Sequence, residues 1–229
     1  MHQTEVVSRD VWHHRFGHPS SQVLDYLSLS GVSKDSLLKN KACEICIHAK
    51  QTRCSFSTSS NKSQFLFEMI HCDLWGPYRT TSHCGARYFL TIIDDYSRSV
   101  WLFLLPTKQG VSQTIRDFLA LVERQFAKHV KTIRSDNGTE FMCLTSFFRE
   151  KGIIHETSCV GTPQQNGRVE RKHRHILNVA RALRFQASLP LEFWGECILT
   201  AAYLINRTPT PILKGKTPFE YLYNRRSII

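Results

Sequence analysis

The sequence predicts an α/β fold in which a mixed five-stranded sheet is flanked by helices and preceded by a small, mainly helical module. Three apolar runs lie close together in the sheet region, and connections this short predict an antiparallel meander of strands. Further along the chain, helical and strand patterns alternate, which is typical of strands added in parallel through helical crossovers. The region before the meander is too small to bury a large core of its own.

The expected elements follow one another between residues 65 and 206. Strands are predicted at 65–74, 87–93 and 100–105, with turn-forming sequences between them. A helix is predicted at 113–129 because apolar residues such as Ile115, Phe118 and Val122 recur at helical spacing. The remaining elements are a strand at 131–134, a short helix at 144–151, a strand at 153–157 and helices at 164–186 and 191–206. A ribonuclease-H-like fold fits this order, as do several other folds. The order of elements therefore does not identify the fold by itself, and the residues at the strand ends are needed to choose between the candidates.

The composition favours a folded protein with a polyanionic partner. Hydrophobic residues make up 41% and charged residues 21% of the 229 residues, which is ordinary for a globular protein. Thirty basic residues face nineteen acidic ones, a net charge of +11, and such an excess favours nucleic acid, although ribosomal and membrane-surface proteins share it. No apolar stretch is long enough to cross a bilayer and no secretory signal is visible, so we expect an intracellular protein with no membrane span.

Four histidine and cysteine residues near the N-terminus have the spacing of a structural zinc site. Four residues separate His13 from His18, two separate Cys43 from Cys46, and 24 lie between the pairs. Two imidazoles and two thiolates can close a tetrahedral zinc site, and the metal would supply folding energy to a module of this size. The alternative is a set of unrelated surface residues, and His14 and His48 are possible substitute ligands. The other cysteines are scattered and are expected to be buried apolar residues.

Three acidic residues stand at the ends of predicted elements. Asp73 lies in an apolar strand, Asp136 follows the first strand predicted to be parallel, and Glu170 lies early in the long helix. Each alone could be a helix cap, a turn residue or a surface ion pair. Together they predict an oxygen-rich site for two divalent ions, Mg²⁺ or Mn²⁺, acting on a phosphodiester.

The helix that carries Glu170 has two distinct faces. At 100° per residue, Arg174, Arg181 and Arg184 lie within about 40° of Glu170, together with Leu177. The apolar residues Val169, Ile176, Ala180 and Leu183 form a separate stripe that can pack on the sheet. The arginines are therefore expected to hold a phosphate backbone beside the metal ions. A solvated basic face is the alternative.

Several sequence blocks, in order along the chain, resemble copia-type retrotransposon integrases. The first is Trp12-His13-His14-Arg15-Phe16-Gly17-His18, similar to the start of that family's pre-integrase zinc region, and Cys43-x-x-Cys46 is similar to its end. Further blocks similar to the family are His71-Cys72-Asp73-Leu74-Trp75-Gly76-Pro77, Ile93-Asp94-Asp95-Tyr96-Ser97-Arg98, Arg134-Ser135-Asp136-Asn137-Gly138-Thr139-Glu140-Phe141, Thr162-Pro163-Gln164-Gln165-Asn166-Gly167 with Glu170-Arg171-Lys172, and Tyr203-Leu204-Ile205-Asn206-Arg207-Thr208-Pro209.

The resemblance implies a function and a set of site residues. It implies a ribonuclease-H-like core with a catalytic triad of Asp73, Asp136 and Glu170, which trims the ends of element DNA and joins them to target DNA. It also implies release from a larger polyprotein, homo-multimers and action in the nucleus. The residues expected to contact DNA are Gln164, Gln165, Asn166, Arg171, Lys172, Arg174, Arg181 and Arg184.

The resemblance also suggests boundaries for the domains. We expect a pre-integrase zinc-binding module at 1–55, a serine-rich linker at 56–64, a catalytic core at 65–185 and a truncated helical extension at 186–229. The sequence departs from the family in the 33 residues between Asp136 and Glu170, a shorter interval than usual, and in Cys159-Val160-Gly161. Two alternatives therefore stay open: a degenerate zinc- and nucleic-acid-binding relic, and a nuclease that cuts without joining.

Overall fold

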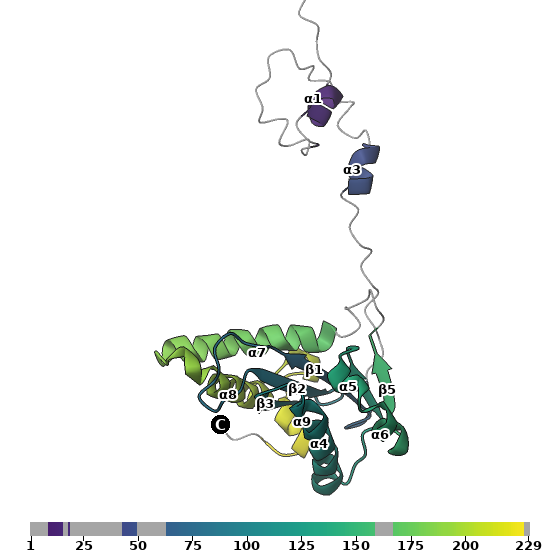
Figure 1. The fold of residues 1–229 in the computed structure, drawn as a ribbon, viewed down its shortest axis with the longest axis vertical. Coiled ribbons are helices and arrows are strands. Elements are labelled where there is room, and N and C mark those ends of the chain that lie inside the picture. The colour runs from purple at the N-terminus through teal and green to yellow at the C-terminus, as the bar shows by residue number, and fades with distance from the viewer. Residues whose placement is uncertain (1–8, 16–17, 19–42, 50–62, 159–166, 227–229) are drawn as a thin grey trace, which may run out of the picture. The chain divides into compact units, whose positions relative to one another are not determined.

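The predicted sheet lies in the larger of two compact units into which the chain divides, Met1–Thr58 and Ser59–Ile229. The structure, a computed structural model, describes residues 9–15, 18, 43–49, 63–158 and 167–226 (Figure 1). In the smaller unit it describes two short helices, α1 (Arg9–Arg15) and α3 (Glu44–Ala49). Among the helices described, none is long and apolar enough to pass through a membrane.

Five strands form one mixed sheet in the order β3-β2-β1-β4-β5. The strands β1 (Met69–Trp75), β2 (Tyr88–Asp94) and β3 (Val100–Leu105) make the predicted antiparallel meander. The strands β4 (Thr132–Ser135) and β5 (Ile154–Thr157) are added in parallel on the other side of β1. The mixed five-stranded sheet predicted from the sequence is therefore confirmed, and β1 is its central strand.

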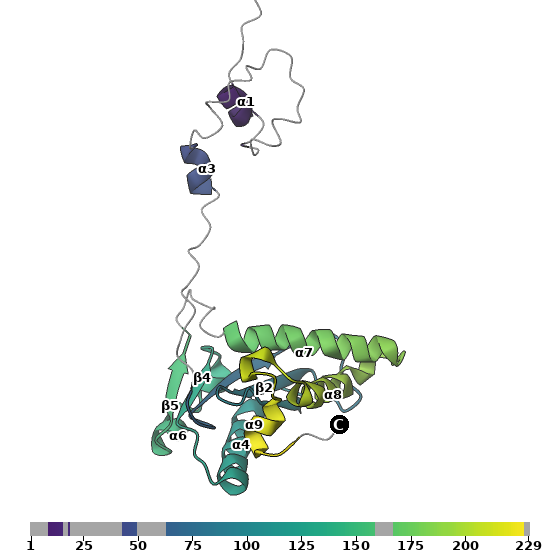
Figure 2. The ribbon, with the colours of Figure 1, turned by 180° about the vertical axis from the view of Figure 1, so that it is seen from behind.

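Helices cover both faces of the sheet because successive side chains of each strand point to opposite sides. On one face, Ile70 and Cys72 of β1 pack in a core with α4 (Gly110–Phe126) and α9 (Pro218–Tyr223). On the other face, Phe89 and Ile93 of β2 pack against α7 (Gly167–Gln186) and α8 (Trp194–Arg207). Figures 1 and 2 show α7 along one side of the sheet and α4 on the opposite side. Asp73 of β1 therefore shares its face of the sheet with α7.

Some predicted boundaries were wrong. The first strand begins at Met69 instead of residue 65, because Phe67 has a left-handed backbone (φ 62°) and donates its N–H to Asp94 Oδ1 at 2.8 Å. The helix predicted to reach residue 129 ends at Phe126, where Ala127 is left-handed (φ 48°). The start of the helix predicted from residue 164 falls outside the described residues.

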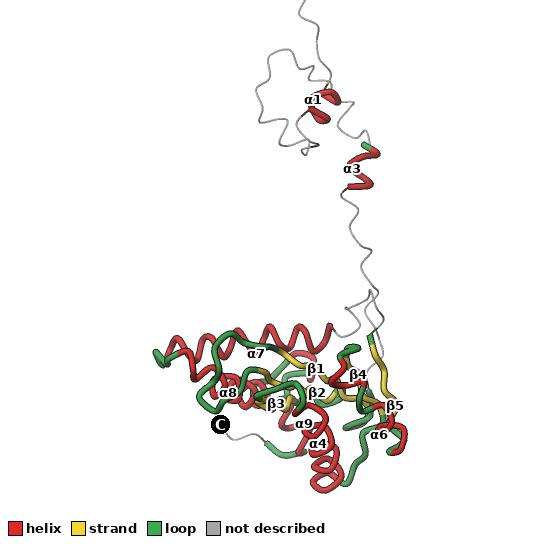
Figure 3. The backbone as a smooth tube through the Cα atoms, viewed as in Figure 1, coloured by secondary structure: helices red, strands yellow, loops and turns green. Residues whose placement is uncertain are grey.

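Other predictions missed short helices and exposed cysteines. The helix predicted at 144–151 is α6 (Thr145–Glu150), drawn red in Figure 3, and a further helix, α5 (Thr139–Met142), labelled in Figure 1, comes before it. Two 3-10 helices, η3 (Leu191–Phe193) and η4 (Pro211–Leu213), flank α8. Cys72 and Cys197 are buried as expected, whereas Cys84 and Cys143 are exposed, so the interpretation of the scattered cysteines as buried holds only in part.

One asparagine connects α8 to the edge of the sheet. Asn206 accepts a hydrogen bond from the Val100 N–H through Oδ1 at 2.9 Å and donates one to the Val100 carbonyl through Nδ2 at 2.7 Å. Val100 is the first residue of the edge strand β3, and its side chain is buried in the core that α8 helps to form. The amide thus satisfies a donor and an acceptor that would otherwise be buried without partners.

We expect Asn206→Ala to lower the free energy of unfolding of the larger unit by roughly 2 kcal/mol, because both backbone groups of Val100 lose their partner. Urea unfolding followed by far-UV circular dichroism measures this change. Asn206→Asp is the comparison variant: it keeps the acceptor for the Val100 N–H but sets a carboxylate oxygen against the Val100 carbonyl, so it should cost at least as much. An alanine variant as stable as the parent would show that these two hydrogen bonds are replaced by water at no cost.

Candidate functional site

Asp73 occupies the centre of the candidate site, on the central strand β1. Its side chain is largely buried, its Oδ1 accepts a hydrogen bond from the Leu74 N–H at 2.9 Å, and it lies opposite Thr91 of β2. Burial, and to a lesser extent the negative charges of Asp136, Glu170 and Glu140, raise the pKa of Asp73 to about 7. The three neighbouring carboxylates therefore lie close enough to Asp73 to disfavour its ionisation.

The acidic residues Asp136 and Glu140 face each other across a glycine at the end of β4. The Gly138 N–H donates to Asp136 Oδ1 at 3.0 Å. A Cβ atom at Gly138 would lie 2.9 Å from Asp136 Oδ1 and 2.8 Å from Glu140 Cδ, so any larger residue would push these carboxylates apart. Glu140 also pairs with Lys108, with Nζ and Oε1 3.5 Å apart. The sequence analysis included Glu140 in a motif but did not single it out.

Glu170 lies in the first turn of α7, and its side chain is exposed. An ion pair between Arg168 of α7 and Asp95 anchors this turn beside the end of β2. Asp95 is buried and also accepts hydrogen bonds from Arg98 at 3.1 Å and from the Ser63 N–H at 3.0 Å, and it lies 2.9 Å from His71 Nε2. Asp95 therefore fixes the start of the helix that carries Glu170, a role that the sequence analysis missed.

A buried histidine joins α7 to the strands beneath it. His173 Nε2 lies 2.8 Å from Thr91 Oγ1, and His173 Nδ1 lies 3.5 Å from Asp73 Oδ2. Burial lowers the pKa of His173 to about 4, so the ring is neutral near pH 7. With its proton on Nδ1, the ring can donate toward Asp73 while Nε2 accepts from the Thr91 hydroxyl. His173 therefore braces the carboxylate of Asp73, and the sequence analysis did not identify it.

The carboxylate oxygens of this site are the type of ligand that binds a divalent metal ion. Mg²⁺ and Mn²⁺ prefer oxygen ligands, and a cation would relieve the repulsion that raises the pKa of Asp73. The predicted triad of Asp73, Asp136 and Glu170 faces one region but does not close into a compact ligand set. Within the part of the chain that the structure describes, the side chains close enough to share one ion are those of His13, His18, Cys43 and Cys46, which we call the N-terminal cluster.

The N-terminal cluster brings together the four predicted zinc ligands His13, His18, Cys43 and Cys46, whose ligand atoms all lie within 4.8 Å of one another. Cys46 Sγ is 3.2 Å from His13 Nε2, and Cys43 Sγ is 3.4 Å from His18 Nδ1. These spacings suit the edges of a tetrahedron around zinc, about 3.3–3.8 Å for bonds of 2.0–2.3 Å. The donor set therefore fits a structural zinc ion.

The possible substitute ligand His14 lies near the cluster but outside it. His14 Nε2 is 3.7 Å from Cys43 Sγ, and its side chain is exposed. The other substitute, His48, has a side chain outside the described residues. A hydrogen bond from the Cys46 backbone, with smaller contributions from His14 and His13, lowers the pKa of Cys43 to about 5. Cys43 is thus poised to be a thiolate, the form that binds metal.

Two family models match separate parts of the chain. Residues 2–51 match the GAG-pre-integrase domain, and residues 67–163 match the integrase core domain. The chain is 41% identical over 219 residues to the retrovirus-related Pol polyprotein from transposon TNT 1-94 of Nicotiana tabacum, and 38% identical over 216 residues to that from transposon RE1 of Arabidopsis thaliana. The chain belongs to the integrase family of retrotransposon Pol polyproteins. The matches cover 93% of this integrase segment but only 16% and 14% of the two polyproteins.

Solved structures support the fold of this integrase segment. The HTLV-2 integrase catalytic core domain, solved in complex with magnesium, matches 70% of this chain and 99% of its own with a TM-score of 0.52 and 19% identity. A simian T-cell lymphotropic virus intasome, solved with a regulatory subunit of PP2A, matches 94% of this chain and 75% of its own with a TM-score of 0.60 and 16% identity. The predicted ribonuclease-H-like architecture is confirmed at the level of fold.

The residues predicted to contact DNA fall into three groups in this integrase segment. Gln164, Gln165 and Asn166 lie outside the described residues. Arg171, Arg174 and Arg181 are exposed on α7 and Arg184 is half-buried, whereas the predicted stripe of Val169, Ile176 and Ala180 is buried on the sheet. Lys172 is half-buried, and burial together with the charge of Arg98 lowers its pKa. Its side chain therefore belongs to the packed side of α7, not to the exposed face that Glu170 shares with Arg174 and Arg181.

Proposed function

We propose that this integrase segment is a polynucleotidyl transferase that trims the ends of element DNA and joins them to target DNA. The observation that carries the proposal is that the largely buried carboxylate of Asp73 has three acidic neighbours, Asp136, Glu170 and Glu140; burial and then their charges raise its pKa to about 7. Repulsion of this kind is costly to a fold, and active sites are where such perturbed groups gather. The known integrase relatives give the reaction class that such a site would serve.

The catalytic residues in this proposal are Asp73, Asp136 and Glu170. They would hold two ions of Mg²⁺ or Mn²⁺, which supply charge stabilisation for the attacking and leaving oxygens of an in-line displacement at phosphorus. The neutral ring of His173 holds the Asp73 carboxylate in place from the side of α7. Asp95 holds the first turn of α7, and Glu170 with it, through Arg168.

In the joining step, the oxygen of a DNA 3′ hydroxyl forms a bond to phosphorus in the target strand. The bond from that phosphorus to its original 3′ oxygen breaks, the attacking hydroxyl gives up its proton, and the leaving oxygen takes up a proton to become a 3′ hydroxyl. In the trimming step, water takes the place of the hydroxyl. Exposed arginines on the Glu170 face of α7, Arg174 and Arg181, would position the phosphate backbone.

The remaining parts of the proposal concern the module, the partners and the compartment. We propose a structural zinc ion held by His13, His18, Cys43 and Cys46 in a module that ends near residue 55, followed by a linker and the catalytic core with its helical extension. The partners are element and target DNA and further copies of this chain. Since chromosomal DNA is the target, the reaction takes place in the nucleus.

The experiment that tests the function uses a branched DNA that mimics the joined product. Such a substrate holds the 3′ hydroxyl next to the scissile phosphate and so demands little additional recognition. We expect the zinc-loaded chain to resolve it only with Mg²⁺ or Mn²⁺, and Glu170→Gln to abolish the reaction. A folded, zinc-loaded chain without turnover would contradict the proposal and favour the binding relic. Hydrolysis without any joined product would favour the nuclease.

A further inference from the structure

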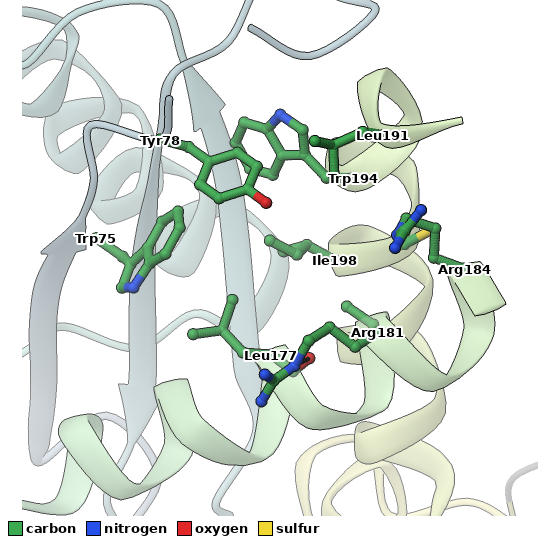
Figure 4. Close-up of a pocket in the computed structure, with 10 residues that line it drawn as sticks. Trp75, Tyr78, Leu177, Arg181, Arg184, Leu191, Trp194 and Ile198 are labelled. Carbon is green, nitrogen blue, oxygen red and sulfur yellow. Dashed lines mark hydrogen bonds between the residues drawn. The ribbon is translucent and has the colours of Figure 1, made fainter. Parts of the chain in front are cut away.

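A cavity of about 240 Å³ lies between the end of β1, α7 and α8, apart from the carboxylates (Figure 4). We call it the aromatic pocket. Its walls include three aromatic rings and two arginines, with Leu177 of α7 between them: Trp75, Tyr78, Trp194, Arg181 and Arg184. Sites for drug-sized ligands have volumes of roughly 300–1,000 Å³, so this one suits a smaller, flat group.

The aromatic rings form a continuous cluster on one side of the pocket. The Trp75 and Tyr78 ring centroids are 5.5 Å apart, and those of Tyr78 and Trp194 are 5.3 Å apart. Trp194 is held in place by a hydrogen bond from Nε1 to the Thr80 carbonyl at 2.9 Å. Figure 4 shows the Tyr78 hydroxyl directed into the open space. The pocket thus combines flat apolar faces with a polar group that points into it.

The two arginines supply positive charge on the opposite side. Arg184 donates to the Leu189 carbonyl at 3.1 Å, and Arg181 donates to the Leu177 carbonyl at 3.2 Å. Arg181 also donates to Asn178 Oδ1 at 2.5 Å, and the Arg184 guanidinium lies 4.5 Å from the centroid of the Phe185 ring. These contacts leave several of the five donors of each guanidinium unused, and no ion pair joins either arginine to a described residue. Aromatic faces beside unpaired guanidinium groups are complementary to a base and its phosphate.

The pocket is continuous with the proposed catalytic site along both β1 and α7. Trp75 follows Asp73 by two residues and points to the same face of the sheet. On α7, Arg181 lies eleven residues after Glu170, about 16 Å along the helix axis at 1.5 Å per residue. That distance corresponds to roughly five phosphate steps of a B-DNA strand. DNA bound at the carboxylates and following α7 would reach the pocket.

We propose that the aromatic pocket binds one unpaired nucleotide of the DNA, with its base on the aromatic rings and its phosphate at the arginines. The inference rests on the proposed function, because trimming a 3′ end leaves unpaired nucleotides on the complementary strand. A paired base is stacked within the duplex and does not present its face to the rings. The pocket therefore distinguishes a trimmed end from a blunt one.

The test compares a blunt duplex with the same duplex carrying a 5′ overhang of five unpaired thymidines, bound to the full zinc-loaded chain in Ca²⁺. Fluorescence anisotropy gives both dissociation constants. We expect roughly tenfold tighter binding of the overhang, within the range for stacking of one base on an aromatic ring. Tyr78→Leu should remove this preference and leave the affinity for blunt duplex unchanged. Leu177→Trp, which fills the pocket from α7 and keeps Tyr78, should do the same.

Tyr203→Leu is the matched control, because Tyr203 is an exposed tyrosine of α8 outside the pocket. It should keep the preference for the overhang. Equal loss of blunt and overhang binding in the pocket variants, or no preference in the parent chain, would overturn the inference while leaving the proposed function intact. A change of molecular mass in light scattering for Tyr78→Leu would also overturn it, since the pocket would then be a contact between copies. No binding of any duplex would instead contradict the proposed function.

Discussion

Asp73→Asn is expected to lower the rate of branched-DNA resolution by about 10³-fold or more. The substitution keeps the size of the side chain and removes the charge at the centre of the four carboxylates. Metal-bound sites contribute several kcal/mol to transition-state stabilisation, and each 1.36 kcal/mol corresponds to a factor of ten in rate. Single-turnover kinetics in Mg²⁺ and Mn²⁺ measure the loss. A rate within tenfold of the parent would remove Asp73 from the catalytic site.

The same variant should fold at least as stably as the parent, which separates chemistry from unfolding. The raised pKa of Asp73 means that the folded protein keeps a proton up to about pH 7, whereas the unfolded chain releases it near its ordinary pKa of 3.8. The folded state therefore binds more protons in this window, and the stability of the metal-free parent falls as pH rises through it. An asparagine at position 73 does not titrate, so the stability of Asp73→Asn should fall less between pH 4 and pH 8 than that of the parent. Thermal melts in chelator from pH 4 to pH 8 measure the difference.

Glu140→Gln is the matched control in both assays. Glu140 lies beside Asp136 across Gly138, but it also pairs with Lys108 on the opposite side. We expect its loss to cost about tenfold or less, because Glu140 acts on the site through its charge and is not one of the proposed metal ligands. A loss as large as that of Asp73→Asn would make Glu140 a fourth member of the site.

The sequence predicted the sheet well because its signals are local. Apolar runs and short turns identified β1, β2 and β3, and the end of β4 placed Asp136 next to the central strand. The start of β1 was missed because Phe67 depends on the carboxylate of Asp94, 27 residues away. No pattern within residues 65–74 contains that information.

The sequence singled out the charged residues of the candidate site but not the residues that support them. Asp73 stood out because a charge in an apolar strand is costly. His173 did not stand out, since its position on α7 is polar in the sequence and becomes buried only through Thr91 and Asp73 of the sheet. Glu140 resembled an ordinary acidic residue in the first turn of a helix, where the helix dipole favours negative charge. Both residues needed the fold before their roles could be inferred.

Removal of zinc is expected to unfold the N-terminal unit and leave the larger unit folded. The unit spans only 58 residues, and its two described helices have six and seven residues, too few to be stable without support. A structural zinc ion can supply on the order of 10 kcal/mol of folding energy in a module of this kind. Limited proteolysis with and without a chelator should show cleavage confined to the first unit. Protection of that unit in metal-free protein would show that it folds without an ion.

The ligand assignment can be separated from this folding effect by comparing two neighbouring histidines. His13 Nε2 lies 3.2 Å from Cys46 Sγ within the four-residue cluster, whereas His14 Nε2 lies 3.7 Å from Cys43 Sγ outside it. We expect His13→Ala to reduce the zinc content from about one ion per chain to near zero, and His14→Ala to leave it unchanged. The reverse result would make His14 the ligand. Because the two residues are adjacent on α1, a general loss of the helix would affect both variants alike, so only a difference between them identifies the ligand.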